Sequence, residues 1–336
     1  MAMKNLKSNS DKKNNEIIEE ISRLSGGELS SLELIAVVYG IKPVMAEMAN
    51  FDKYDSKFIK KLDRINELCK KLSLHFIVST KKFIINSPRG IFEMVDLNSS
   101  QKGKIAFGIS KDKDAALEGV NLYYKKMLSD EDGINFGRVM GYPECCLDFG
   151  RYLCENSKGD KKLNPDNFGF ANPAVESLKR SKEFAWQLNV FSSSVLSYYP
   201  CTLNCQESIK YVNKLLKIIK KINPQYEEYL VSLLKEPASL YWTCVDKILF
   251  YGDFTGDFEN SEVKYYKVVP ELNSEKFYQN NNPKFLNDLK KVKGKVQKGN
   301  RLIMTPNYFE IYKDKKRIVK IKKDNQYEPI LVKPNK

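Results

Sequence analysis

Histidine is almost absent from this chain, since only one of its 336 residues, His75, is of that type. A metal site with several imidazole ligands is therefore excluded. A Ser-His-Asp or Cys-His catalytic centre would have to use that single side chain. His75 lies in LSLHFIVST, whose apolar neighbours predict a strand. We therefore expect a structural histidine in the core or at a sheet edge, and triad-type hydrolase chemistry is disfavoured.

Long apolar runs are missing as well. The longest extends from Leu34 to Ile41, far below the roughly 20 residues needed to cross a bilayer. The first residues, MAMKNLKSNSDKKNN, contain neither the apolar segment nor the small-residue cleavage site of a secretion signal. These absences predict a cytoplasmic protein without a membrane span.

The pattern of apolar residues divides the chain into three parts. Residues 1–14 are rich in Lys and Asn, which predicts a disordered tail. Residues 15–236 are expected to form a mainly helical domain that includes a small mixed sheet, and residues 237–336 a basic, mostly β module. The predicted fold class is α+β, with a helical central region between a small N-terminal sheet and a C-terminal sheet.

Periodicity also places individual elements. The strands of the small sheet are expected at 75–79, 82–86, 90–96 and 104–109. Helices are expected over 51–72, 113–128, 143–156, 173–190, 200–222 and 225–235, with a loop over 129–143. Strand patterns fill the C-terminal module around one helix near 283–291.

Two short motifs contain four of the seven cysteines: GYPECC with Cys145 and Cys146, and YPCTLNC with Cys201 and Cys205. Without a secretion signal, cysteines are better read as metal ligands, redox thiols or buried apolar groups than as disulfides. In both motifs a proline precedes the cysteines, which predicts the first position of a helix. The helix dipole and the unpaired N–H groups of a first turn stabilise a thiolate.

Four thiolates from two helix starts would satisfy a tetrahedral zinc site or a cubane iron–sulfur cluster. Neither pair has the CxxC spacing of zinc knuckles, and the CxxxCxxC pattern of radical enzymes is missing because Ser208 occupies its last position. A redox dithiol or persulfide site and inert buried thiols remain as alternatives. The other cysteines, Cys69, Cys154 and Cys244, are expected to be structural.

Positive charge is concentrated at the C-terminal end. Residues 281–336 contain 14 Lys and 2 Arg against 5 acidic residues, which gives +11 of the net +14 of the whole chain. Such a patch could bind the phosphates of RNA or an acidic protein. A solvated surface without a partner is the alternative interpretation.

The cysteine motifs also carry a resemblance. GYPECC followed by PCTLNCQES resembles an uncharacterised archaeal family, mainly from methanogens, that is defined by GYPxCC and PCxxxCxxS. The resemblance covers mainly residues 104–222. It implies a role in metallocofactor biosynthesis together with other cofactor-assembly proteins, such as maturation of the iron-guanylylpyridinol cofactor of Fe-hydrogenase. Family members tend to have His and Ser where this chain has Tyr199 and Thr202, which argues against histidine-assisted chemistry here.

The leading hypothesis is therefore an iron–sulfur or iron-binding protein of an anaerobic archaeon, with a 4Fe-4S cluster favoured over zinc and acting in metallocofactor biosynthesis. Glu144 and Glu207 beside the cysteine pairs are candidates for proton transfer, and Arg138 and Lys210 for binding an anionic substrate. The alternatives are a thiol or persulfide enzyme acting on RNA and a zinc-stabilised interaction protein. Whether the protein is an enzyme stays open.

Overall fold

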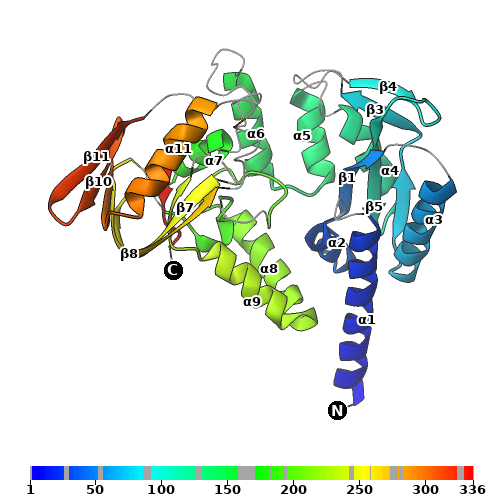
Figure 1. The fold of residues 1–336 in the computed structure, drawn as a ribbon. Coiled ribbons are helices and arrows are strands. Elements are labelled where there is room, and N and C mark those ends of the chain that lie inside the picture. Colours follow the sequence, from blue (N-terminus) through cyan, green and yellow to red (C-terminus); the bar gives the residue numbers. More distant parts are fainter. Residues whose placement is uncertain are drawn as a thin grey trace. The chain divides into compact units, whose positions relative to one another are not determined.

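The structure is a computed structural model, and it describes residues 2–25, 30–51, 56–85, 92–125, 130–157, 171–181, 183–191, 195–241, 246–257, 259–272, 279, 283–323 and 329–335. The chain divides into two compact units, Met1–Glu155 with Lys210–Glu228, and Asn156–Ile209 with Tyr229–Lys336. The second unit takes in residues 156–209, which the sequence had assigned to the preceding domain. Both units combine helices with an antiparallel sheet (Figure 1), so the predicted α+β class is confirmed.

The sheet of the first unit is antiparallel and has the order β1-β5-β3-β4, with β2 also paired to β5. Its strands are β1 (Val44–Phe51), β2 (His75–Val78), β3 (Lys81–Ile85), β4 (Phe92–Asp96) and β5 (Gly103–Ser110). The four predicted strands are confirmed, and β1 is an addition. Its sequence, VMAEMANF, is poor in β-branched residues, so the strand depends on pairing along the whole of β5, from Val44 opposite Ser110 to Phe51 opposite Gly103.

Six helices accompany this sheet in the described part of the first half of the chain. They are α1 (Ala2–Leu24), α2 (Ser31–Val38), α3 (Ser56–Lys71), α4 (Lys113–Lys125), α5 (Asp130–Val139) and α6 (Glu144–Ser157). The helix expected over 51–72 begins later, because Phe51 is the last residue of β1. The loop expected over 129–143 is wrong, since α5 occupies most of it.

The disordered tail predicted for residues 1–14 is also replaced by structure, because α1 runs from Ala2 to Leu24 as one helix. Ile17, Ile18 and Ile21 are buried and fix its C-terminal half. The N-terminal half gains a tertiary contact that composition does not reveal: the hydroxyl of Tyr39 donates a hydrogen bond to Oδ1 of Asp11, at 3.0 Å.

The second unit contains a seven-stranded antiparallel sheet in the order β11-β10-β9-β8-β7-β6-β12. Its strands are β6 (Ala238–Tyr241), β7 (Asp246–Gly256), β8 (Ser261–Leu272), β9 (Arg301–Met304), β10 (Tyr308–Lys313), β11 (Lys316–Lys322) and β12 (Ile330–Val332). The strands predicted for the C-terminal module are therefore confirmed. The helix predicted near 283–291 is α11 (Pro283–Val296), which continues into the lysine-rich segment.

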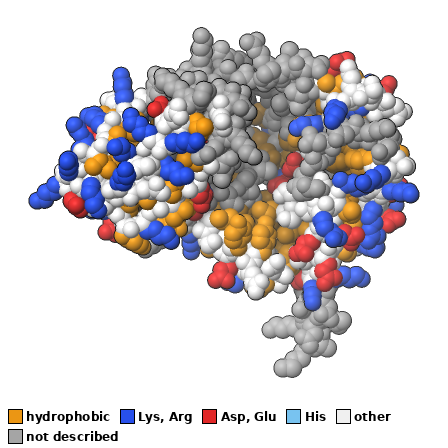
Figure 2. Space-filling view, in the orientation of Figure 1, with side chains coloured by type: hydrophobic (Ala, Val, Ile, Leu, Met, Phe, Trp, Pro, Cys, Tyr) orange, Lys and Arg blue, Asp and Glu red, His pale blue; other side chains and the backbone are white. Residues whose placement is uncertain are grey.

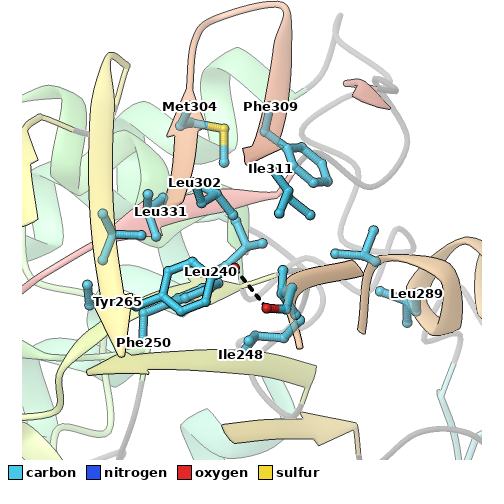
Figure 3. Close-up of a cluster of buried hydrophobic side chains, with 14 of the residues drawn as sticks. Leu240, Ile248, Phe250, Tyr265, Leu289, Leu302, Met304, Phe309, Ile311 and Leu331 are labelled. Carbon is cyan, nitrogen blue, oxygen red and sulfur yellow. Dashed lines mark hydrogen bonds between the residues drawn. The ribbon is translucent and has the colours of Figure 1, made fainter. Parts of the chain in front are cut away.

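The main core of this unit lies between α11 and one face of the sheet. Leu289 and Val296 of α11 belong to the same buried cluster as Leu302, Phe309 and Ile311 of the strands. Figure 3 shows these strand side chains directed toward Leu289. The sheet therefore buries one face beneath α11, and at β6 and β12 its other face packs against a second buried cluster that includes Phe184 and Phe191.

The remaining helices are α7 (Ala171–Lys179), the short 3-10 helix η2 (Trp186–Leu188), α8 (Gln206–Ile222) and α9 (Pro224–Leu234). The single helix expected over 173–190 is wrong, because α7 ends at Lys179 and only one further turn, η2, follows before Val190. Among the helices of the described ranges, none combines the length and the apolar character required to cross a membrane.

Candidate metal centre

The first cysteine motif begins with a helix stop. Helix α5 ends at Val139, and the N–H of Tyr142 donates to the carbonyl of Gly137 (3.0 Å) while the N–H of Gly141 donates to that of Arg138 (3.0 Å). This pair of bonds is a Schellman motif, in which the residue at C′ adopts a left-handed conformation. Gly141 has φ +77°. The left-handed backbone conformation at this position therefore favours glycine over residues with a Cβ atom.

A second constraint on the same glycine comes from far upstream in the chain. A Cβ atom at Gly141 would lie 2.5 Å from Cδ of Pro43. At Gly137 a Cβ would lie 2.5 Å from Cδ2 of Leu147, so α5 and α6 approach closely at that point. The turn between these two helices is therefore held by steric fit on both sides.

Tyr142 is anchored by a buried ion pair. The ammonium group of Lys42 lies 5.4 Å from the centroid of the Tyr142 ring and is paired with the carboxylate of Glu33. Burial lowers the pKa of Lys42, and the charge of Glu33 opposes that shift. Tyr142 also packs against a cluster that includes Val44 and Phe136. The aromatic residue of the motif is thus a structural anchor.

Cys145 and Cys146 lie in the first turn of α6, as predicted. Pro143 directly precedes the helix, and its carbonyl accepts hydrogen bonds from the N–H groups of Cys146 (2.8 Å) and Leu147 (3.0 Å). The side chain of Cys145 is exposed and Cys146 is 5% exposed. At this position the helix dipole favours the thiolate form of both side chains.

The second motif differs from the expectation. Helix α8 begins at Gln206, not at Pro200, so Cys201 lies in a turn outside the helix. Cys205 is the N-cap residue, because its carbonyl accepts the first helical bond, from the N–H of Ile209 at 2.9 Å. The predicted helix start at Pro200 is therefore wrong.

Contacts of the residues between these two cysteines fix the turn instead. Leu203 is fully buried among Phe184, Phe191 and other apolar side chains. Its carbonyl accepts a hydrogen bond from the N–H of Ala185 at 2.9 Å. The hydroxyl of Ser177 donates to the carbonyl of Pro200. The segment is thus tied to the protein at both ends.

Two further polar contacts complete this turn. The side-chain amide of Asn204 donates to Oε2 of Glu183 at 2.6 Å. Ser208, which stands three residues after Cys205, is fully buried and accepts a hydrogen bond from the hydroxyl of Tyr198 at 3.1 Å. Its hydroxyl thus has a structural partner within the protein.

The structure brings the four motif cysteines together. The sulfur atoms of Cys145, Cys146, Cys201 and Cys205 all lie within 4.8 Å of one another. The Sγ atoms of Cys145 and Cys146 are 3.9 Å apart. Cys146 and Cys205 are buried, Cys201 is partly buried and Cys145 is exposed. Four thiolates at these distances could hold a metal ion.

The distances bear on what such a centre would bind. Around one tetrahedral ion with bonds of about 2.3 Å, sulfur atoms lie about 3.8 Å apart. The observed limit of 4.8 Å requires only a slight contraction to reach that arrangement. In a cubane each thiolate binds a different iron at a different corner, which requires wider spacing. Holding a single ion would therefore need only this small contraction of the four thiolates.

Two of the charged residues predicted to serve the site are bound to each other. Arg138 donates from Nε and Nη2 to the two carboxylate oxygens of Glu144, at 2.8 and 3.2 Å. The hydrogen bond from Arg138 lowers the pKa of Glu144. The guanidinium predicted to hold a substrate is thus engaged with a carboxylate of the protein. Glu207 and Lys210 are exposed near the start of α8, and their roles stay predictions.

The remaining cysteines and the histidine lie apart from this cluster or beyond the described side chains. Cys69 is fully buried in α3, and burial raises the pKa of its thiol to about 12. Cys154 belongs to α6, and Cys244 lies outside the described residues. His75 is exposed at the first position of β2. It therefore occupies the end of a strand and not the core.

The sequence had not pointed to the supports of the site, Lys42, Pro43 and Ser177. Gly141 followed by Pro143 is a recognisable signal for a helix end and a helix start, but its partners come from distant segments that periodicity does not connect. Comparison with known proteins finds no family model, no curated protein and no solved structure that matches this chain.

Proposed function

We propose that this chain is a metal-binding protein whose four motif cysteines bind one thiophilic ion, zinc or iron. The observation that carries the proposal is the mutual distance of the four sulfur atoms, at most 4.8 Å. Soft thiolate ligands select such ions over magnesium or calcium. Within each motif, the turn that presents the two thiols is built by backbone hydrogen bonds and by packing of neighbouring residues.

The burial of the ligands supports a role in metal handling. A structural zinc site is usually closed within the protein. Here Cys145 is exposed, so an acceptor ligand can approach the ion from solvent. Together with the archaeal motif resemblance, this supports a place in metallocofactor assembly, in which the centre receives and passes on its ion.

The test is anaerobic purification followed by metal and acid-labile sulfide analysis. We expect about one zinc or iron ion per chain and no sulfide. Titration of the metal-free protein with Co²⁺ should give the intense thiolate charge-transfer and d–d bands of a tetrahedral tetrathiolate site. Changing all four ligands to serine should abolish both signals. The matched control is Cys69→Ala, which removes a buried thiol outside the cluster and should retain the ion.

Two other results would contradict a site for a single ion. Iron and sulfide in equal amounts, at about four each per chain, would replace the single ion by a cubane cluster. Failure to bind Zn²⁺, Fe²⁺ or Co²⁺ in a folded protein with four titratable thiols would overturn the proposal. It would leave the redox dithiol as the better interpretation.

A further inference from the structure

Over strands β8 to β11, the face of the C-terminal sheet turned away from α11 carries a mixture of cations and tyrosines. Strands alternate their side chains between two faces. Val263, Leu302, Phe309 and Ile311 belong to the core beneath α11. The residues that alternate with them define what we call the basic face: Lys264, Tyr266, Arg301, Tyr308, Tyr312, Arg317, Lys320 and Lys322.

The strand register aligns these residues in a row. Lys264 of β8 lies opposite Arg301 of β9, Arg301 opposite Tyr312 of β10, and Tyr312 opposite Arg317 of β11. At about 4.8 Å between neighbouring strands, the row spans about 14 Å. Three of these four adjacent strands therefore contribute a cation to the row, and Tyr312 of β10 lies between Arg301 and Arg317.

Carboxylates on the same face are paired with several of these cations. Arg301 donates from Nε and Nη2 to the two oxygens of Glu262, at 2.9 and 3.0 Å. Glu310 accepts from Arg317 at 2.9 Å and lies 3.4 Å from Lys320. Asp253 lies opposite Lys264 in the register. The cations still outnumber these carboxylates.

The surrounding surface adds to this charge. Lys315, in the turn between β10 and β11, and Lys313 and Lys316, at the adjoining strand ends, are exposed and lie next to the face. Figure 2 shows lysine and arginine side chains gathered over the part of the molecule that contains α11, β10 and β11. A polyanion would therefore be attracted to this part of the molecule.

The tyrosines supply flat surfaces between the charges. Tyr266 is 85% exposed, more than any other large apolar or aromatic side chain of the described residues. The ammonium of Lys320 lies 3.5 Å from the centroid of the Tyr308 ring, and the guanidinium of Arg301 lies 5.3 Å from that of Tyr312. Exposed aromatic rings and guanidinium planes are surfaces on which unpaired bases stack.

We propose that the basic face binds single-stranded nucleic acid, with phosphates along the row of cations and an unpaired base on Tyr266. This binding goes beyond the metal centre and does not depend on it. Lysines on an edge strand such as β11 can also serve only to prevent pairing with another chain. That explanation does not cover Lys264, Tyr266 and Arg301, which lie on β8 and β9, within the sheet.

The test measures fluorescence anisotropy of labelled oligouridylate and oligothymidylate of equal length with the full chain at about 50 to 200 mM salt. We expect binding of both that weakens steeply with salt, and weaker binding of an RNA duplex of the same charge. The difference between oligouridylate and oligothymidylate shows whether RNA or DNA is preferred. Absence of binding at the lowest salt would overturn the proposal. Displacement of the oligonucleotide by poly-glutamate at a lower charge concentration would also overturn it, in favour of an acidic protein.

Two pairs of variants separate the basic face from net charge. Lys320→Glu with Lys322→Glu should weaken binding about tenfold or more and reduce the salt slope by about 1.4, the value for two lost phosphate contacts on a single strand. The matched control, Lys57→Glu with Lys60→Glu on exposed positions of α3, changes the net charge equally and should alter binding less than about twofold. Equal losses in both variants would contradict a specific face.

The stacking contact is tested separately by Tyr266→Ala. We expect about a tenfold loss of affinity with an unchanged salt slope, since stacking is worth about 1–3 kcal/mol per base. Tyr266→Phe should retain binding. Tyr229→Ala removes another exposed tyrosine, on α9, and should have no effect. Circular dichroism and thermal melting verify that each variant is folded. Wild-type affinity in Tyr266→Ala would remove the stacking role and with it the single-strand proposal.

Discussion

Burial separates two kinds of thiol in this protein. Cys69 is fully buried in α3, and burial raises the pKa of its thiol to about 12. Cys145 is exposed in the first turn of α6. Since the thiolate is the reactive form, the two side chains should differ strongly in their reaction with alkylating agents.

We therefore expect chelator-treated, folded protein to be alkylated by iodoacetamide at Cys145 within minutes at pH 8, while Cys69 reacts only after denaturation. Peptide mass spectrometry measures both sites in one digest. Addition of Zn²⁺ before the reagent should protect Cys145 and leave Cys69 unchanged. Rapid labelling of Cys69 in the folded state would show that its segment opens to solvent.

For single residues, the sequence predicted the environment of a side chain where a local pattern alone determined it. The apolar stripe of α3 placed Cys69 in the core, and two unusual motifs singled out four cysteines that the structure brings together. The sequence did not reveal contacts that form only when the chain is folded. The ion pair of Arg138 with Glu144, across the turn between α5 and α6, was not foreseen, and the substrate role of Arg138 stays a prediction.

The turn between α5 and α6 sets the position of two candidate ligands, Cys145 and Cys146. A side chain at residue 141 would be strained twice, by the φ of +77° and by the contact with Pro43. Gly141→Ala should lower the free energy of unfolding by about 1–3 kcal/mol. Because the turn aims Cys145 and Cys146, the affinity for Co²⁺ should fall as well.

Urea unfolding measures the first effect and a Co²⁺ titration the second. The matched control is Gly294→Ala in α11, where a Cβ atom meets nothing within 4 Å. That change should leave metal affinity unaltered and should stabilise the helix slightly. A Gly141→Ala variant with wild-type stability would show that the turn tolerates a side chain and that the glycine has another purpose.

Elements with strong periodicity were predicted well, and those that depend on distant partners were not. In the C-terminal sheet, β9 and the first half of β8 alternate between buried and more exposed residues, and β6 and β12 are short apolar runs; all of these were found. Strand β1 lacks that pattern and exists through pairing with β5. The start of α8 was placed at Pro200 because proline often begins a helix. The hydrogen bond of Ser177 to Pro200 and the burial of Leu203 instead hold an irregular turn there.

For the whole molecule, the net charge of +14 makes stability sensitive to acid. Glu310 of β10 is paired with Arg317 and Lys320 of β11. The hydrogen bond from Tyr312, and to a smaller extent that from Arg317, lowers the pKa of its carboxyl group. A carboxyl group whose folded pKa is lowered stabilises the protein above its unfolded pKa of about 4.3. That contribution is lost as the pH falls through the folded value.

We expect the melting temperature to be nearly constant from about pH 8 to 5.5 and to fall steeply below about pH 4. Glu310→Gln should lower it at neutral pH, with a smaller further drop in acid. Glu228→Gln, at an exposed position of α9, is the control and should follow the wild type. Identical acid curves for Glu310→Gln and wild type would show that this carboxylate contributes nothing to stability.

The close contact of Gly141 with Pro43 also decides whether the first cysteine motif can be transferred to another protein. Short zinc-binding knuckles can be moved between proteins because their ligands and their supports lie in one brief segment. Here the supports, Lys42 and Pro43, come from a distant part of the chain. A synthetic peptide or a graft that carries only GYPECC would therefore lack the geometry, and the pair is not a portable module.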